Sequence, residues 1–433
     1  MELRPHRLPT DVLDRLAAGG GGAEAAEHLT AVQYSRHLLL IRGILDQAVR
    51  GSESAHRAYD LLADLAKQAP DAVAQVIRYP AVGAWARQTL SRLLRRSPDP
   101  VEPAQLGAIA AVAAIRAGVS ACVEVPSSGG GIMLPSIGRL SLETDGTQLV
   151  KLRVDASGAI DLGESRTDLT QLHRLASADK AIDLVVDDLD PYRWVPADVI
   201  DGRLSADELR TWESCLDTAW RMLDEHHWTI AGELRSIVSV LTPIKGPERG
   251  QNSASARDTF GTIALSTPPD GRWLACTFAH EIQHAKLGAI LDVVDLTLPD
   301  AREYYAPWRP DPRPLSGLLQ GAYAYLGVAG FWRRQRLVDD DEWSHVEFAH
   351  WRASAFEVTE TLLGSGRLTP EGDRFVSGMR RTLSAWMDEP VPAAAQVTAH
   401  HEAAGHRKAW NARNGRERVT GAAGRSPSRS AHP

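Results

Sequence analysis

Two histidines four residues apart are the strongest chemical signal in the chain. His280 and His284 enclose Glu281 in an HExxH pattern. On a helix, residues four apart project from the same face, so both imidazoles can reach one metal ion. Apolar neighbours such as Phe278 and Ile282 would bury this helix, and a buried histidine needs a hydrogen bond or a metal. We therefore expect a catalytic metal ion held by His280 and His284.

Two histidines leave such a site incomplete, because catalytic zinc and iron sites take a third protein ligand and keep positions open. A zinc peptidase would take a glutamate from a following helix and use Glu281 as general base. Glu303 stands 19 residues after the motif, but four prolines at 307–314 forbid a helix there. Asp292 stands eight residues after the motif, where Gly288 could end the helix and let the chain turn back. Asp292 is the predicted third ligand, and an exposed surface acid is the alternative.

The helix that carries the motif has clear boundary signals. Asp270 is a suitable N-cap for it, and a short apolar strand is expected before it at residues 262–265. Ser205 and Glu208 form a capping box, which predicts a helix that runs towards residue 226. Apolar spacing predicts further helices at residues 230–241, 315–333 and 342–363.

The N-terminal half of the chain has two different hydrophobicity patterns. Apolar residues recur at helical spacing in the first hundred or so residues, through 29–49, 81–94 and 103–117. After Gly118 the pattern alternates, which predicts a small antiparallel sheet with strands at residues 119–125 and 149–154 and a further strand at 182–186. The fold class expected is therefore α+β and predominantly helical.

Four regions are expected along the chain. The end of the chain carries seven Arg or Lys residues between 407 and 429 against one acid, Glu417, with much Gly, Ser and Ala. Such a composition is typical of disorder. The regions are a helical part at 1–117, a β-rich part at 118–204, a helical catalytic domain at 205–390 and a disordered basic tail at 391–433.

Composition narrows the class of protein. The chain is 43% hydrophobic and 24% charged, with a formal net charge of −7, which argues against nucleic-acid binding by the main body. The first residues lack the apolar core of a secretion signal, and no run approaches the roughly 18 apolar residues of a membrane span. We expect a cytoplasmic protein without a nucleic-acid or membrane partner, and the oligomeric state stays open.

The motif region resembles a known family. The stretch TFAHEIQHAKL at residues 277–287, the aromatic and proline segment at 304–309 and the segment at 312–315 carry the likeness. They resemble the actinobacterial HExxH-motif proteins described as α-ketoglutarate-dependent peptide β-hydroxylases. The specific part covers residues 253–333, and the N-terminal half matches more loosely.

The resemblance implies that the metal is Fe(II), that α-ketoglutarate and O₂ are cosubstrates, and that a ribosomally made precursor peptide is the partner. A site with two histidines and one carboxylate leaves positions for a bidentate oxo-acid and O₂. Arginine suits the far carboxylate of α-ketoglutarate, because it can donate two charge-assisted hydrogen bonds. Arg309 and Arg313 are the predicted cosubstrate ligands, with Tyr305 as a weaker candidate.

Three functions compete at this point. The first is a non-haem iron and α-ketoglutarate-dependent peptide hydroxylase, in which Glu281 supports the histidines and is not a base. The second is a Zn(II) metallopeptidase, which requires Glu303 or Glu347 as a ligand and Glu281 as the base. The third is a binding protein with a structural metal, which requires a closed shell of four ligands.

Overall fold

The chain folds into two compact units. The computed structural model describes residues 6–48, 53–96, 102–143, 146–163, 168–194, 199–200, 202–247, 250–339 and 341–422. Unit 1 combines Met1–Gly21 with Ile290–Pro433, and unit 2 is Gly22–Ala289. The predominantly helical α+β class is confirmed, but this division differs from the four regions expected along the sequence.

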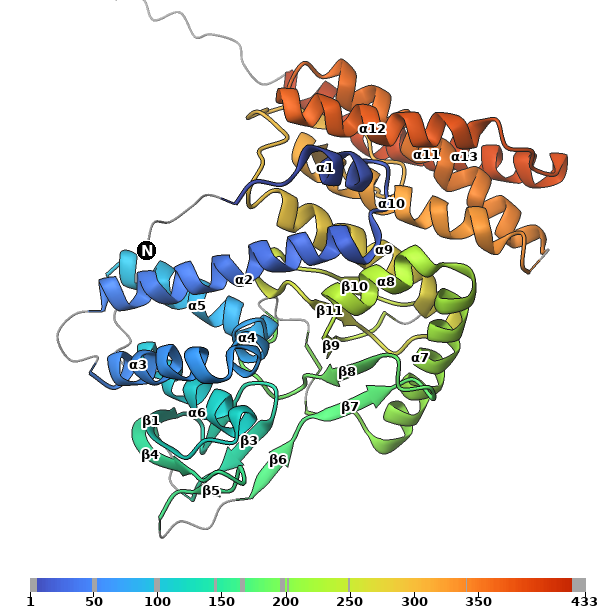
Figure 1. Ribbon diagram of the computed structural model, residues 1–433. Coiled ribbons are helices and arrows are strands. Elements are labelled where there is room, and N and C mark those ends of the chain that lie inside the picture. Colours follow the sequence, from blue (N-terminus) through green and yellow to red (C-terminus); the bar gives the residue numbers. More distant parts are fainter. Residues whose placement is uncertain are drawn as a thin grey trace, which may run out of the picture. The chain divides into compact units, whose positions relative to one another are not determined.

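Unit 2 begins with a group of helices, as predicted. They are α2 (Gly22–Gln47), α3 (Glu53–Gln68), α4 (Pro70–Ile77), α5 (Pro80–Leu94), the 3₁₀ turn η1 (Pro103–Gln105) and α6 (Leu106–Ala117). The long α2 packs against α5, and α3 packs against α6 (Figure 1). Gly118 ends α6 with a φ of 65°, a left-handed conformation that glycine adopts without strain. Residue 49, at the end of one predicted helix, lies outside the described residues.

Two small antiparallel sheets follow, and the first confirms the strands predicted at residues 119–125 and 149–154. One has the order β1 (Ala121–Ser127), β4 (Gln148–Val154), β5 (Ile160–Asp161), and the other β2 (Gly131–Leu134), β3 (Gly138–Ser141), β6 (Leu169–Gln171). Ala121 lies opposite Val154 at one end of the β1–β4 pair. Their inner faces belong to one large apolar core that also includes the faces of α3, α5 and α6.

A five-stranded mixed sheet supports the motif and was not predicted as a whole. Its strands are β7 (His173–Ala176), β8 (Asp183–Val186), β9 (Val240–Pro243), β10 (Ser253–Ala254) and β11 (Thr262–Leu265). Their order is β10-β11-β9-β8-β7, and β9 runs parallel to both β8 and β11. The helix predicted at residues 230–241 is wrong at its end: α8 covers Trp228–Ile237, and β9 takes the rest. A short apolar run fits a buried parallel strand as well as a helix.

The two remaining helices of unit 2 begin where their caps predict. The predicted capping box is present at α7 (Ala206–His226), between Ser205 and Glu208. In α9 (Gly271–Ile290), Asp270 Oδ1 accepts a hydrogen bond of 2.7 Å from the Trp273 amide. A Cβ at Gly271 would lie 2.5 Å from Thr218 Cβ, so glycine allows α9 to begin in close contact with α7.

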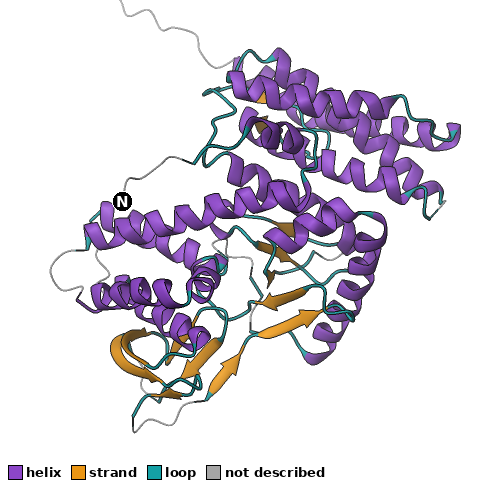
Figure 2. Ribbon diagram, in the orientation of Figure 1, coloured by secondary structure: helices purple, strands orange, loops and turns teal. Residues whose placement is uncertain are grey.

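Unit 1 is a helical bundle with one short pair of strands. Its elements are α1 (Thr10–Ala17), β12 (Glu303–Tyr304), β13 (Arg313–Pro314), α10 (Leu315–Gln335), α11 (Glu342–Gly364), α12 (Pro370–Met387) and α13 (Ala393–Ala422). Helix α11 packs against α10, α12 and α13, and α1 packs against α12. Figure 2 shows how strongly helix dominates this unit. The Tyr323 hydroxyl donates to the Leu16 carbonyl at 2.7 Å, which fixes the N-terminal helix to α10.

The prediction of a disordered tail from residue 391 is wrong for α13. Ala395 and Ala399, four residues apart, are buried against Val346 and Ala349 of α11. Small residues at this spacing let two helices approach closely, whereas overall composition does not reveal the packing. Residues 423–433 of the predicted tail lie outside the described residues. Among the helices described, none combines the length and hydropathy that a membrane crossing requires.

Candidate metal centre

His280 and His284 converge on one point in unit 2. Their Nε2 atoms are 3.1 Å apart, and the ring planes meet at 73°. Two nitrogens bound to one ion at about 2.0–2.1 Å, with an angle between about 90° and 110°, are separated by about 2.9–3.4 Å. A hydrogen bond between two neutral rings fits the same distance. The separation of the two ring nitrogens is thus already one that a single metal ion can bridge.

His280 is held as a neutral imidazole. Burial, and then the adjacent His284, lower its pKa to about 3. A neutral ring keeps a nitrogen lone pair for a metal over the physiological pH range. The environment thus favours the form of histidine that binds metal ions.

Glu281 points away from the solvent and is held by β10 and the residue that follows it. Its side chain is only 1% exposed. The Ser253 hydroxyl donates to Oε1 at 2.7 Å, and the Ser255 hydroxyl donates to Oε2 at 2.8 Å. Ser255 also lies within 3.2 Å of the Glu281 carbonyl. Both carboxylate oxygens are therefore engaged, and the group connects the motif helix to the sheet.

A second polar contact anchors α9 to α8. Lys286 Nζ lies 2.9 Å from both carboxylate oxygens of Glu233, and the two side chains are 0% and 3% exposed. Burial lowers the pKa of Lys286, and Glu233 partly offsets that change. Glu233 also accepts from the Gly22 amide at 3.1 Å. One buried ion pair thus joins the motif helix, α8 and the first residue of α2.

The third metal ligand is not assigned within unit 2. Among its described residues, no His, Cys, Asp or Glu side chain joins the two histidines in a group of three or more that could hold a metal ion. The predicted ligand Asp292 belongs to unit 1, in the turn that follows α9. Glu303 lies in β12 and not in a helix, as the prolines indicated.

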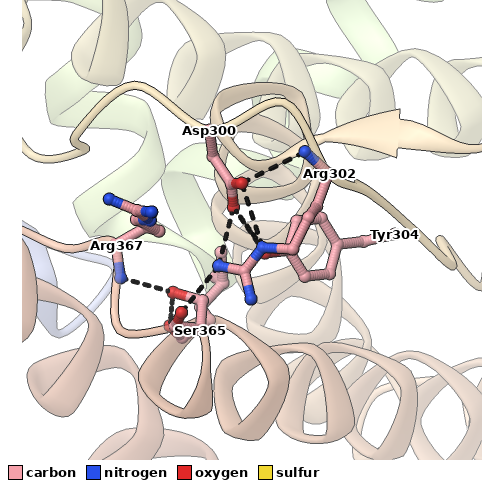
Figure 3. Close-up of polar contacts among 6 residues, drawn as sticks. Asp300, Arg302, Tyr304, Ser365 and Arg367 are labelled. Atoms are coloured by element: carbon pink, nitrogen blue, oxygen red, sulfur yellow. Dashed lines mark hydrogen bonds and ion pairs between the residues drawn. The ribbon is translucent and has the colours of Figure 1, made fainter.

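The segment that leads to β12 is held by Asp300, whose side chain is 5% exposed beside the half-exposed Arg302. Asp300 accepts hydrogen bonds from Arg302 Nε at 3.0 Å and from the Tyr304 hydroxyl at 2.6 Å, as Figure 3 shows. Arg302 also donates to the Ser365 carbonyl at 2.7 Å. The Arg302 hydrogen bond, and then that of Tyr304, keep the pKa of Asp300 well below its ordinary value.

Tyr305 contacts α13. Its hydroxyl lies 2.9 Å from His406 Nδ1, and Arg407 lies over its ring at 4.0 Å from the centroid. The Trp410 ring meets it edge to face at 5.2 Å. Tyr305 thus packs against α13, a helix that the sequence pattern did not predict, and its role as a weaker candidate for cosubstrate binding stays a prediction.

Arg309 and Arg313 share one partner. Arg309 Nε lies 3.1 Å from Asp311 Oδ1, and Arg313 lies 3.8 Å from Asp311 Oδ2. About half of the Arg309 side chain and a third of the Arg313 side chain are exposed. The structure thus brings the two predicted cosubstrate ligands together in unit 1, as it brings His280 and His284 together in unit 2.

The groups that support the motif, Ser253, Ser255 and Lys286, have no strong signature in the sequence. Ser253 and Ser255 precede Glu281 by 28 and 26 residues, and no local pattern links them. Lys286 gave a weak signal, because a lysine between Ile282 and Leu287 interrupts the apolar surroundings of the motif. A lysine in such a position needs a buried acid.

Comparison with known proteins does not add to these observations. No family model matches the chain, and no curated protein matches it.

Proposed function

We propose that this protein is a cytoplasmic Fe(II)- and α-ketoglutarate-dependent enzyme that hydroxylates the β-carbon of a side chain in a ribosomally made precursor peptide. The observation that carries the proposal is the state of Glu281 beside the histidine pair. A zinc peptidase needs this glutamate as general base, yet both of its oxygens accept hydrogen bonds from serines. An iron hydroxylase needs no base at this position. The likeness of residues 253–333 to HExxH-type peptide hydroxylases agrees with this choice.

His280 and His284 would hold the metal through their ring nitrogens, with Asp292 as the proposed third ligand. Their Nε2 separation of 3.1 Å fits two ligands of one ion. When bound, iron supplies the activation of O₂: one oxygen atom enters the peptide C–H bond, and the other converts α-ketoglutarate to succinate and CO₂. Glu281 keeps the motif helix fixed against the sheet, so that both imidazoles stay aligned.

Arg309 and Arg313 are the proposed partners for the far carboxylate of α-ketoglutarate. Both face Asp311 now, so an incoming carboxylate would compete with an acid that the arginines already bind. Arg309 would exchange its hydrogen bond to Asp311 for one to the cosubstrate, whereas Arg313, at 3.8 Å from Asp311, would gain one. Since Arg313 is the less exposed of the two, we expect it to contribute more.

The test is an assay with defined products. The full chain, purified without oxygen, is incubated with Fe(II), α-ketoglutarate, ascorbate and the short peptides encoded beside its gene. We expect one peptide to gain one oxygen atom, with an equal amount of succinate formed. Cleaved peptide without added oxygen, together with zinc in the purified protein, would overturn the proposal in favour of a peptidase.

Variants connect this activity to the site. His280→Ala should abolish oxygen incorporation, because one imidazole cannot hold the ion in place. His28→Ala is the matched control, since His28 is an exposed histidine of α2 in the same unit. Arg313→Ala should raise the concentration of α-ketoglutarate needed for half-maximal rate at least about tenfold, the loss expected for a charge-assisted contact.

A further inference from the structure

The residues that hold Glu281 also form one edge of the five-stranded sheet. Strand β10 pairs with β11 and with no other strand of the described residues. It lies at the end of the order β10-β11-β9-β8-β7, and Figure 1 shows this end beside the region of α8 and α9 within unit 2. A sheet edge presents backbone groups that another strand can pair with.

The register shows which backbone groups face outward. Ser253 lies opposite Leu265 and Ala254 opposite Ala264, and the Ser266 amide donates to the Asn252 carbonyl at 2.9 Å. Residues 252 and 254 therefore form the hydrogen-bonded pairs with β11, because such pairs alternate in an antiparallel ladder. The backbone groups of Ser253 and Ser255 consequently point away from β11.

An independent bond supports this assignment. The carbonyl of Leu265, the residue opposite Ser253, accepts from the Ile244 amide at 3.1 Å. Leu265 thus directs its backbone towards the β9 side of β11 and not towards β10. Its partner Ser253 must then direct its own backbone to the open edge.

The side chains of Ser253 and Ser255 bind Glu281, whereas their backbone groups face the open edge of the sheet. Both hydroxyls donate to the Glu281 carboxylate. Among the described residues, no hydrogen bond reaches the amide or carbonyl of Ser253 or Ser255 from the open side. These groups stand two residues apart, about 6.8 Å along a strand, and both serines are partly exposed. The open edge therefore has the donors, acceptors and spacing that one more strand requires.

We propose that an extended segment of the peptide substrate adds to the sheet along the open edge of β10, with its backbone paired to Ser253 and Ser255. The identity of the occupant as substrate rests on the proposed function. Glu281 follows His280 directly, so the two serine contacts set the distance between this edge and the histidine pair. Recognition through the main chain makes binding tolerant of peptide sequence.

Strand pairing also determines which side chains of the peptide approach the site. Side chains of a strand alternate between the two faces of a sheet. The Ser253 and Ser255 side chains both reach Glu281 of α9, so every second side chain of the added strand lies on the face of α9. The modified residue must be one of these, and its immediate neighbours along the peptide must face the other way.

The test measures peptide binding without turnover. Overlapping twelve-residue synthetic peptides, which cover the peptides encoded beside the gene, are labelled and titrated with the full chain in the absence of O₂ and α-ketoglutarate. Hydrogen exchange is followed at the Ser253 and Ser255 amides. We expect at least one peptide to bind and to slow exchange at both amides, while the amides of β7, at the opposite edge, keep their rates.

Two perturbations separate main-chain pairing from other modes of binding. Ser255→Pro removes the outward amide and the hydroxyl, whereas Ser255→Ala removes only the hydroxyl, so the proline variant should bind the peptide about tenfold more weakly than the alanine variant. Methylation of single backbone nitrogens in the bound peptide leaves the protein untouched. It should weaken binding at every second position.

Several results would overturn the proposal. They are a bound peptide that leaves exchange at Ser253 and Ser255 unchanged, affinity that is indifferent to N-methylation, and absence of binding by every peptide tested. The outcome is independent of the hydroxylation assay. Peptide binding at β10 without oxygen incorporation would contradict the proposed function only. Hydroxylation without slower exchange at the β10 amides would contradict the proposed strand addition only.

Discussion

Polar groups are stabilised in opposite ways in unit 2 and in the 300–313 segment of unit 1. The Lys286–Glu233 pair of unit 2 is almost inaccessible, with exposures of 0% and 3%. The Arg309–Asp311 pair of unit 1 is 49% and 46% exposed. A buried pair has no water to replace a lost partner, whereas an exposed pair has. The motif helix is therefore held by contacts that tolerate little change, and the predicted cosubstrate arginines by contacts that exchange easily.

The acids of the two regions show the same contrast in the direction of their pKa shifts. Burial, and then the neighbouring Asp187, raise the pKa of Asp190 in unit 2 to about 8. Hydrogen bonds from Arg302 and Tyr304 lower the pKa of Asp300 in unit 1. Burial outweighs the attraction of Arg193 and keeps Asp190 protonated, whereas direct hydrogen bonds from Arg302 and Tyr304 keep Asp300 charged.

Loss of the buried cation should have the largest effect. Lys286→Ala leaves Glu233 buried without a counter-ion, which we expect to lower the free energy of unfolding by about 3–5 kcal/mol. Urea unfolding followed by circular dichroism measures this change. Lys67→Ala is the control, because Lys67 pairs with Asp64 at the surface of α3 and should change stability little.

The double variant Lys286→Met, Glu233→Leu tests whether the stability lost in Lys286→Ala comes from the uncompensated charge of Glu233. It removes both charges and replaces them with apolar side chains of similar size. We expect it to recover most of the stability that Lys286→Ala loses, because the desolvation cost disappears together with the attraction, although the hydrogen bond from the Gly22 amide to Glu233 is lost as well. A double variant as unstable as the single one would show that the pair itself, and not the uncompensated charge, stabilises α9.

Asp190 should make unit 2 less stable as pH rises. Its folded pKa of about 8 lies above the ordinary value of 3.8, so between these values the folded state binds the additional proton. The free energy of unfolding therefore falls between about pH 4 and pH 8, by a few kcal/mol at most. Asp190→Asn should remove this slope.

The free energy of unfolding should be compared between wild type and Asp190→Asn at each pH. His280 acts in the opposite direction, because its folded pKa of about 3 lies below its ordinary value and its contribution to stability rises from about pH 3 to pH 6.5. The difference between the two proteins cancels His280 and reports Asp190 together with the adjacent Asp187, whose pKa burial also raises. A pH-independent difference would contradict the burial argument for this acid.

The serines on Glu281 should have an intermediate effect. Ser253→Ala removes one hydrogen bond to a buried carboxylate, which we expect to cost about 1.5–3 kcal/mol of unfolding free energy. The cost should shrink in a Glu281→Gln background, because the acceptor is then uncharged. Ser236→Ala is the control, since its hydroxyl donates within its own helix to the Gly232 carbonyl. Equal losses in both backgrounds would show that Glu281 is not the partner that matters.

Local signals explain which parts of the fold the sequence predicts. The N-cap of α9 at Asp270 and the capping box of α7 involve residues three apart, so the chain encodes them within one turn. The His280–His284 pair is predictable for the same reason, because one helical turn brings the rings together. Such features do not depend on the rest of the fold.

Contacts between distant segments explain what the sequence does not predict. The serines on Glu281 belong to an edge strand whose pairing with β11 decides which way their side chains point. Helix α13 was missed because its composition is typical of disorder, although Ala395 and Ala399 keep a helical spacing. Helix α8 was extended too far because residues 240–243 are apolar in either structure. Each error concerns tertiary packing and not local preference.

The smallest effect is expected at Asp300, where the pKa is lowered and not raised. Its contribution to stability is present above the ordinary pKa of 3.8 and is lost as pH falls through the lower folded value. Asp300→Asn should therefore shift the midpoint of urea unfolding slightly at pH 6, and the shift should shrink only in strong acid. Asp295→Asn, at an exposed acid of the same segment, is the control. Because Arg302 and Tyr304 can turn to water when the carboxylate is removed, a shift as large as that of Lys286→Ala would contradict the contrast between the two regions.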